Sequence, residues 1–418
     1  MTDPASEHKL PAADLLLFGF AFTVMLARYF LYLEGMPLVH LLFVAAKMAL
    51  VPLAIILVLR TPGKPTVIDL ATLVYGATMF AMYVINRTQV GSITLYILDI
   101  FIYWALCRWF FARRSLFPLK AMTWILGAFA LLNLALMILR PNGLWPSPIG
   151  GSMNFLLGGN YNNMGKAFLF MLIANILLLD LLPRTEHHER RIYIVLLAVN
   201  ILVTLGSELM VGSKTSLVGI LLLLAFASLL LIPRSRALRI TAVSLLVVIY
   251  FALQNWAVFR SMDKPSHQVE FFVEQVLKKD MTFSFRTHVW GRSKLLIERQ
   301  PITGYGQQEK EWYDYELGVI NPHNLILSIL VKGGAIALAA FLLLILVTHL
   351  FMLHRYTRIP DDLPGAHVGY ILLASLWIYL FMMIFEVFTF STVSILLTCI
   401  GYLYPRRSGT KVLPFCQS

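Results

Sequence analysis

The sequence predicts an all-α membrane protein that crosses the bilayer about twelve times and carries one large extracytoplasmic loop containing short helices. Of its 418 residues, 59% are hydrophobic and only 13% are charged, whereas soluble domains carry about 25% charged residues. The mean hydropathy is +0.75. These values exclude a soluble globular fold, and one membrane domain over residues 1–418 accounts for the chain.

The expected spans are apolar runs of about 20 residues, the length that an α-helix needs to cross the hydrocarbon core. They are residues 13–33, 38–59, 66–85, 93–112, 121–139, 164–182, 192–210, 215–232, 240–258, 324–352, 367–386 and 388–404. The segment before the first run lacks a basic stretch and an Ala-x-Ala cleavage pattern. We therefore expect that run to be a retained helix and not a signal peptide.

Cations in the short connections predict how these spans are oriented, because cytoplasmic loops are enriched in Lys and Arg. The cations on one side are Arg60, Lys64, Arg108, Arg113, Arg114, Lys120, Arg184, Arg190, Arg191, Arg234, Arg236, Arg239, Arg355, Arg358, Arg406 and Arg407. That side is expected to be the cytoplasm, with both termini in it and with residues 140–163, 211–214 and 259–322 outside. The net charge of +12 fits cationic loops facing anionic lipid and does not indicate nucleic acid binding.

The large loop, residues 259–322 between the ninth and tenth spans, is the longest polar interruption of the chain. Within it, residues 283–298 are predicted to form an amphipathic helix, because apolar side chains recur there at helical spacing. Arg286 and Arg292 flank that apolar stripe, and we expect their guanidinium groups to converge on one oxyanion. The alternative is a basic helix that lies on lipid headgroups. Pro301 and the sequence Gly304-Tyr305-Gly306 are expected to turn the chain after the helix.

A second candidate lies in the short outer connection that includes Gly212, Ser213 and Lys214. Gly212 is expected to end one helix and Ser213 to cap the next. The next helix would then start with free backbone N–H groups beside Lys214 and the hydroxyl of Thr215, which predicts an anion site. The spacing of glycines excludes a nucleotide-binding P-loop. The alternative is that Lys214 reaches to the membrane surface only.

His323 is a candidate general base at the start of the tenth span. We expect Asn321 to cap that helix and Pro322 to occupy its first turn. A helix N-terminus disfavours a positive charge, so the imidazole of His323 should be neutral and able to accept a proton. A structural role for a single interfacial histidine remains the alternative.

Sugar contacts are a weaker expectation. Tyr305 and Trp312 offer aromatic faces, and Asn160 offers an amide in a Gly- and Asn-rich outer connection. The aromatic belt at any membrane interface has a similar composition. We expect no metal site and no cofactor, because Asp263, Asp280 and Asp314 stand alone in the large loop.

Four short motifs, in this order, resemble the O-antigen ligase and polysaccharide polymerase superfamily. They are Gly-Ser-Lys-Thr-Ser at residues 212–216, Phe-Arg-Thr-His-Val-Trp at 285–290, Pro-Ile-Thr-Gly-Tyr-Gly at 301–306, and His-Asn-x-x-Leu at 323–327 with a glycine pair after it. The resemblance covers residues 155–350. Arg292 with Leu296, and His323 with Gly334, match spacings of the ligase branch. The surroundings of Arg286 and of Gly304-Tyr305-Gly306 look at least as similar to capsule and exopolysaccharide polymerases.

The resemblance implies a glycosyltransferase of the bacterial cytoplasmic membrane with its active site on the outer face. The donor would be an oligosaccharide linked to undecaprenyl diphosphate, and the acceptor a growing glycan or lipid A-core. Membrane lipid, a chain-length regulator and a flippase are implied partners in building lipopolysaccharide or exopolysaccharide of the cell envelope. In the implied mechanism His323 and Arg286 are catalytic, while Lys214, Arg286, Arg292, Ser213 and Thr215 bind the diphosphate.

Two alternatives stay open from the sequence. The first lies within the family, because motifs that serve the donor do not distinguish a polymerase of repeat units from an O-antigen ligase. The second is a glycan transporter, since about twelve spans with both ends inside also fit secondary transporters. The external position of the long loop and the lack of a repeat relation among the intramembrane charges favour the enzyme.

Overall fold

The structure, a computed structural model, describes most of the expected helices. The described residues are 37–60, 66–88, 102, 104–105, 116–139, 161–182, 185–211, 214–232, 235–255, 284–308, 310–318, 322–359 and 365–384. The expected spans 13–33 and 388–404 lie outside these residues, as does nearly all of 93–112. The number of twelve spans and the sides of the membrane on which the termini lie are therefore untested.

Every regular element in the described residues is helical, which confirms the all-α prediction. The helices are α2 (Pro37–Arg60), α3 (Val67–Ile85), α5 (Phe117–Leu139), α6 (Tyr161–Leu181), α7 (His187–Val211), α8 (Lys214–Ser228) with the 3-10 turn η2 (Leu229–Leu231), α9 (Arg236–Asn255), α11 (Ser284–Arg299), α12 (Lys310–Leu317), α13 (Leu325–Arg358) and α14 (Val368–Met382). Helix α11 confirms the amphipathic helix expected at 283–298, whereas α12 was not expected.

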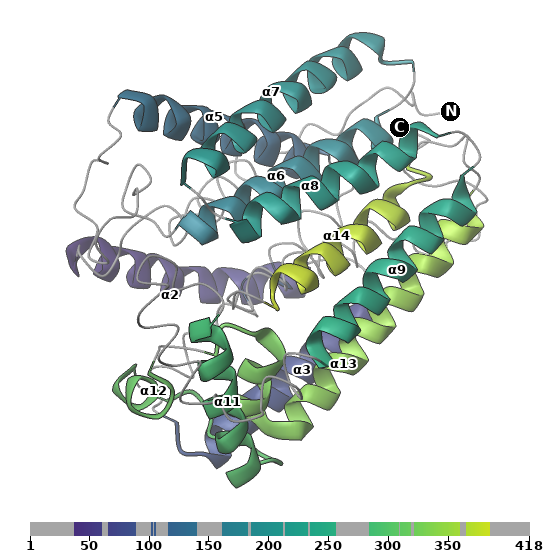
Figure 1. The fold of residues 1–418 in the computed structure, drawn as a ribbon. Coiled ribbons are helices and arrows are strands. Elements are labelled where there is room, and N and C mark those ends of the chain that lie inside the picture. The colour runs from purple at the N-terminus through teal and green to yellow at the C-terminus, as the bar shows by residue number, and fades with distance from the viewer. Residues whose placement is uncertain are drawn as a thin grey trace.

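Length and apolar composition identify five of these described helices as able to cross a membrane. They are α3, residues 119–139 of α5, residues 187–210 of α7, α9 and α13. Helices α8 and α14 are apolar but shorter. The chain is thus a multi-pass membrane protein, and the described helices lie side by side in a bundle with α11 and α12 at one end (Figure 1).

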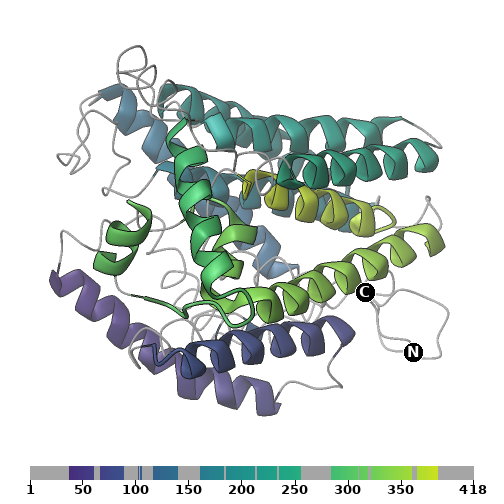
Figure 2. The ribbon, with the colours of Figure 1, turned by 60° about the horizontal axis from the view of Figure 1, so that its bottom comes forward.

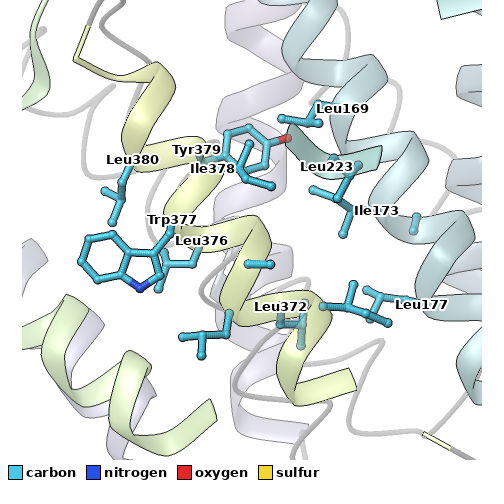
Figure 3. Close-up of a cluster of buried hydrophobic side chains, with 14 of the residues drawn as sticks. Leu169, Ile173, Leu177, Leu223, Leu372, Leu376, Trp377, Ile378, Tyr379 and Leu380 are labelled. Carbon is cyan, nitrogen blue, oxygen red and sulfur yellow. The ribbon is translucent and has the colours of Figure 1, made fainter. Parts of the chain in front are cut away.

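Helix α14 is the centre of the bundle. All its residues except Phe381 are buried, and it packs against α6, α8, α9 and α13. Leu372 and Tyr379 point toward leucine side chains of α6 and α8 (Figure 3). A helix that is apolar on all sides is expected in such a position. Its C-terminal end therefore meets the ends of several other helices.

Helix α13 is broken at Gly334, where the backbone adopts φ 63° and ψ −165°. The tenth expected span, 324–352, is thus corrected to two helices, one over 325–333 and a longer one from 335 to Arg358. Figure 2 shows the bend of α13 beside α11. Such a break leaves backbone N–H and C=O groups without intrahelical partners, which is costly away from water.

The segment 301–306 satisfies these groups. The backbone N–H groups of Tyr305 and Gly306 donate to the carbonyls of Val331 (2.7 Å) and Lys332 (2.8 Å), and Ala335 N donates to the carbonyl of Pro301 (2.8 Å). The motif Pro-Ile-Thr-Gly-Tyr-Gly, expected to form a turn, is therefore a strap docked into the break of α13. We call residues 301–306 the strap below.

Glycine is required on both sides of this contact. At Gly304, which has φ 62°, a Cβ would lie 2.7 Å from the backbone nitrogens of Gly333 and Gly334. At Gly334 a Cβ would overlap the carbonyl of Ile302. Both residues also have positive φ, which L side chains rarely adopt. The sequence contains these glycines, but only the fold shows that they face each other.

The strap is also tied to the end of α3. The Asn86 side chain donates to the Thr303 carbonyl (3.1 Å), the Gln300 amide donates to Asn86 Oδ1 (2.9 Å), and Gln307 N donates to Thr88 Oγ1 (3.1 Å). Because α3 packs along α13, the strap joins the loop, the break and α3 into one unit.

We expect Gly304→Ala and Gly334→Ala each to lower the apparent melting temperature of the purified protein by about 5 °C or more, since a new Cβ would displace backbone that is hydrogen bonded. Thermal unfolding in detergent measures this. Gly291→Ala is the matched control, because Gly291 lies in α11 with open space around the position of a Cβ. The control should be neutral or slightly stabilising. Equal melting temperatures for all four proteins would contradict the proposed tightness of the strap.

Candidate functional site

The C-terminal end of α14 brings two predicted site segments together. Leu325 N, at the start of α13, donates to the Met383 carbonyl (2.9 Å). Gly219, in the second turn of α8, lies directly against the Met382 side chain. The start of α8, with Lys214, and the start of α13, with His323 just before it, therefore lie at the same end of the bundle. The sequence predicts both helix starts on the same side of the membrane, because successive spans run in opposite directions.

Helix α8 begins at Lys214, as expected, and Thr215 is half-buried in its first turn. The N-terminus of this helix thus presents backbone N–H groups and the positive end of the helix dipole. Ser213, the expected cap, and the side chain of Lys214 lie outside the described residues. The cap therefore remains a prediction.

Three helices meet closely beside the start of α8. A Cβ on Gly165 of α6 would overlap Ser216 of α8 and would lie 2.8 Å from Oε1 of Glu208 on α7. Glu208 and Ser216 are both buried, and so is Lys166, whose carbonyl accepts a hydrogen bond from the Tyr379 hydroxyl (3.0 Å). This buried polar junction was not predicted as part of the site. Its signal in the sequence is Glu208, a carboxylate inside an apolar span.

His323 does not lie in the first turn of α13, so that expectation was wrong. The helix begins at Leu325 and its N-cap is Asn324, whose side chain accepts from Leu327 N (3.1 Å). The cap is therefore Asn324 and not Asn321, and Pro322 precedes the helix instead of lying in its first turn. His323 instead precedes the cap in a left-handed conformation, with φ 49°, and is half-buried. Asn324 prevails as the cap because its extended backbone lets the side chain turn back onto the helix.

Asn324 was missed as a site residue. It is fully buried, and its amide nitrogen donates to Gln254 Oε1 (3.0 Å) and to the Ile384 carbonyl (3.3 Å). Gln254 lies in the last turn of α9, and its own amide donates to the Tyr250 hydroxyl (3.4 Å). One side chain thus connects α9, the start of α13 and the turn just after α14, next to His323. The motif His-Asn gave the only sequence signal for it.

Helix α11 packs on the first half of α13. Trp290 and Val289 are fully buried, and Trp290 contacts Leu327. Trp290 therefore belongs to the α11–α13 contact, and the side chain of Arg286 lies outside the described residues. Arg292 is exposed, and its Nη1 would be 3.7 Å from a Cβ on Gly318, just after α12. The convergence of the two guanidinium groups remains a prediction.

Tyr305 and Trp312 lie side by side, although they come from different segments. Their ring centroids are 5.2 Å apart, and Trp312 also meets Tyr313 edge-on at 5.1 Å. Tyr305 and Trp312 are half-buried, whereas Tyr313 is buried beneath them. The Lys332 ammonium, next to the break of α13, lies 5.9 Å from the Tyr313 ring centroid. These rings form an aromatic patch over the strap, and Asn160 lies outside the described residues.

Burial raises the pKa of the Tyr305 hydroxyl; the nearby charge of Arg299 lowers this pKa by a smaller amount, and that of Glu316 raises it. Burial likewise raises the pKa of Tyr313. Both hydroxyl groups therefore stay protonated at neutral pH and act as hydrogen-bond donors or acceptors without charge. Among the described residues no group of three or more His, Cys, Asp and Glu side chains is placed to hold a metal ion.

We expect Gly165→Ala to destabilise the protein by about 2 kcal/mol, since overpacking a close helix contact costs this much, and to lower activity because the contact adjoins the start of α8. The double variant Gly165→Ala with Ser216→Gly should regain stability, because the second change removes the atoms that the new methyl group overlaps. Gly206→Ala, whose Cβ would lie 3.6 Å from Leu134, is the control. A double variant less stable than Gly165→Ala alone would contradict this packing.

A comparison with protein families gives a match in the part of the chain that holds most of these elements. Residues 192–342 match the family described as O-antigen ligase, a segment that holds Lys214, Arg286, Arg292, His323 and the break of α13. A search of curated proteins found no match. The match confirms the resemblance seen in the motifs of the sequence. Residues 192–342 of this membrane protein are therefore similar to the O-antigen ligase family.

Proposed function

We propose that this protein transfers an oligosaccharide from undecaprenyl diphosphate to a saccharide hydroxyl, at the outer face of the bacterial cytoplasmic membrane. The observation that carries the proposal is the meeting of the starts of α8 and α13 at the end of α14, with α11 packed on the first half of α13. These elements carry the predicted cations and the predicted base.

The donor diphosphate would lie at the start of α8. Backbone N–H groups and the dipole of a helix N-terminus bind phosphate, and Lys214, Ser213 and Thr215 would add a cation and hydroxyl groups. Arg286 and Arg292 on α11 would hold the same diphosphate and stabilise the charge that develops on it as the glycosidic C–O bond breaks. Lys214 would act as a point charge and not as a bidentate clamp.

His323 would act as the general base. Its imidazole would take the proton of the acceptor hydroxyl while that oxygen bonds to the anomeric carbon and the undecaprenyl diphosphate leaves. We expect inversion at the anomeric carbon, because no carboxylate is proposed as a nucleophile. Tyr305, Trp312 and Asn160 would contact sugars, and the pairing of the two aromatic rings over the strap supports this for Tyr305 and Trp312.

Fixed cations, and not a metal ion, would stabilise the leaving group in this mechanism. The outer loop has several cationic side chains on and near α11, whereas its aspartates stand singly in the sequence. A divalent ion on phosphate usually depends on one or two carboxylates.

The acceptor distinguishes two candidate functions. We propose polymerisation of repeat units of O-antigen, capsule or exopolysaccharide, supported by the motif around Arg286 and by the sequence of the strap. The second candidate is ligation of a finished glycan to lipid A-core. The family description O-antigen ligase and the spacing of His323 and Gly334 favour it.

Purified protein in detergent should convert a synthetic lipid-linked donor and an acceptor without a sealed membrane, which a transporter cannot do. His323→Ala should lower turnover by a factor of about 10² to 10⁴, the range for general acid–base catalysis, at unchanged protein yield. Chromatography of the labelled glycan measures this. Full activity of His323→Ala would remove the general base from the proposal.

The same assay tests the cations. Arg292→Ala should lower turnover by a factor of about 10² to 10³, as the loss of one donor to a developing anion does. Lys294→Ala is the matched control, because Lys294 lies on the same helix and pairs with Glu298 at 3.4 Å. Equal loss in both variants would indicate a general effect of charge on lipid headgroups.

Deletion of the gene in its host should separate the two acceptors. A polymerase deletion should reduce surface glycan to single repeat units, whereas a ligase deletion should leave long polymers on the lipid carrier. Gel electrophoresis of surface glycan and mass analysis of lipid-linked glycan measure both. Repeat units trapped at the cytoplasmic face would instead indicate transport.

A further inference from the structure

The backbone at His323 needs an external restraint. A non-glycine residue with positive φ is strained by an amount on the order of 1–3 kcal/mol, and such strain persists only where the surrounding structure enforces it. His323 has φ 49°, and the next residue, Asn324, is extended with φ −150° and ψ 128°. The chain therefore bends at His323 before α13 begins.

Asn324 is the residue that holds this bend. Its side-chain oxygen accepts from Leu327 N, and its nitrogen donates to Gln254 Oε1 and to the Ile384 carbonyl. The next backbone N–H, that of Leu325, donates to the Met383 carbonyl (2.9 Å). All these groups are in a buried setting, where an amide that loses its partner costs about 1–3 kcal/mol.

The bond to Gln254 also closes the large loop. Gln254 is in the last turn of α9, just before the loop, and Asn324 follows the loop directly. A capping function alone requires only an acceptor oxygen, which serine or aspartate supplies equally well. The donations from Asn324 to Gln254 of α9 and to the Ile384 carbonyl, just after α14, are therefore not needed for capping.

We propose that Asn324 is a positioning residue, which through its hydrogen bonds to Gln254 and Ile384 holds His323 at the place where the acceptor hydroxyl is deprotonated. This inference rests on the proposed function of His323 as general base. A misplacement of about 1 Å at a reacting group costs about 10²-fold in rate. Asn324 thus contributes to turnover and not to binding of the donor.

The test compares variants that keep the cap with variants that remove the donation. Asn324→Ser keeps a capping oxygen, and Gln254→Leu removes the acceptor. We expect each to lower kcat at least about 10-fold with the KM for donor changed less than about 2-fold. The double variant should be no slower than the slower single one, because both changes break the same bond.

Thr66→Ala is the matched control. Thr66 caps α3, where its side chain accepts from Asp69 N, and the opposite end of α3 is the one that contacts the strap. This variant should lose a similar amount of thermal stability without losing kcat. Unchanged kcat in Asn324→Ser and Gln254→Leu, or an equal loss of kcat in Thr66→Ala, would overturn the proposal.

A negative charge at position 324 gives a second measurement, the pKa of His323, which a loss of helix stability alone does not change. In Asn324→Asp a carboxylate would be introduced on the residue next to His323, and an opposite charge nearby raises the pKa of histidine. The acidic limb of the pH profile of kcat/KM should therefore move up by about one pH unit. NMR titration of histidine-labelled protein, with the signal of His323 assigned by its loss in His323→Ala, measures the same pKa without turnover. An unmoved pKa overturns the proposal.

These outcomes separate the two hypotheses. An inactive His323→Ala together with a fully active Asn324→Ser refutes the positioning role alone. A fully active His323→Ala refutes the general base. The NMR titration then still shows whether a charge at position 324 acts on the imidazole of His323.

Discussion

The broken helix α13 and the strap docked into it form the contact on which the end of the molecule that carries α11 and α12 depends. Backbone groups freed by a break in a membrane helix need partners, because lipid offers none. The strap supplies them through Tyr305, Gly306 and Pro301. The same strap is bonded to Asn86 at the end of α3. The strap thereby fixes the first half of α13 at the break, and the bond from Leu325 N to the Met383 carbonyl fixes its start after His323.

This contact explains why short motifs that are far apart in the sequence belong together. The glycine at 304 is needed so that the strap can approach the backbone at 333 and 334, and the glycine at 334 is needed so that α13 can bend towards the strap. The aromatic patch of Tyr305, Trp312 and Tyr313 lies above the same contact. The motifs are thus the two halves of one structural element beside the candidate site.

A second centre of organisation is the end of α14. Its last residues contact the start of α8 through Met382 and the start of α13 through Met383, while Ile384 receives the amide of Asn324. Because α14 is buried on nearly all sides, its end has little freedom to move. A rigid platform of this kind is what a preorganised catalytic site requires.

The sequence by itself determined the fold class and most helix bounds, since apolar runs of span length and the helical spacing in α11 are local signals. It also placed Lys214 at the start of α8, and its motifs indicated the family. Only the tertiary structure decided the break at Gly334, the cap at Asn324 and the buried junction of Gly165, Glu208 and Ser216. Each of these depends on partners far away in the chain, such as Gln254 for Asn324, and local patterns carry no information about which distant groups will meet.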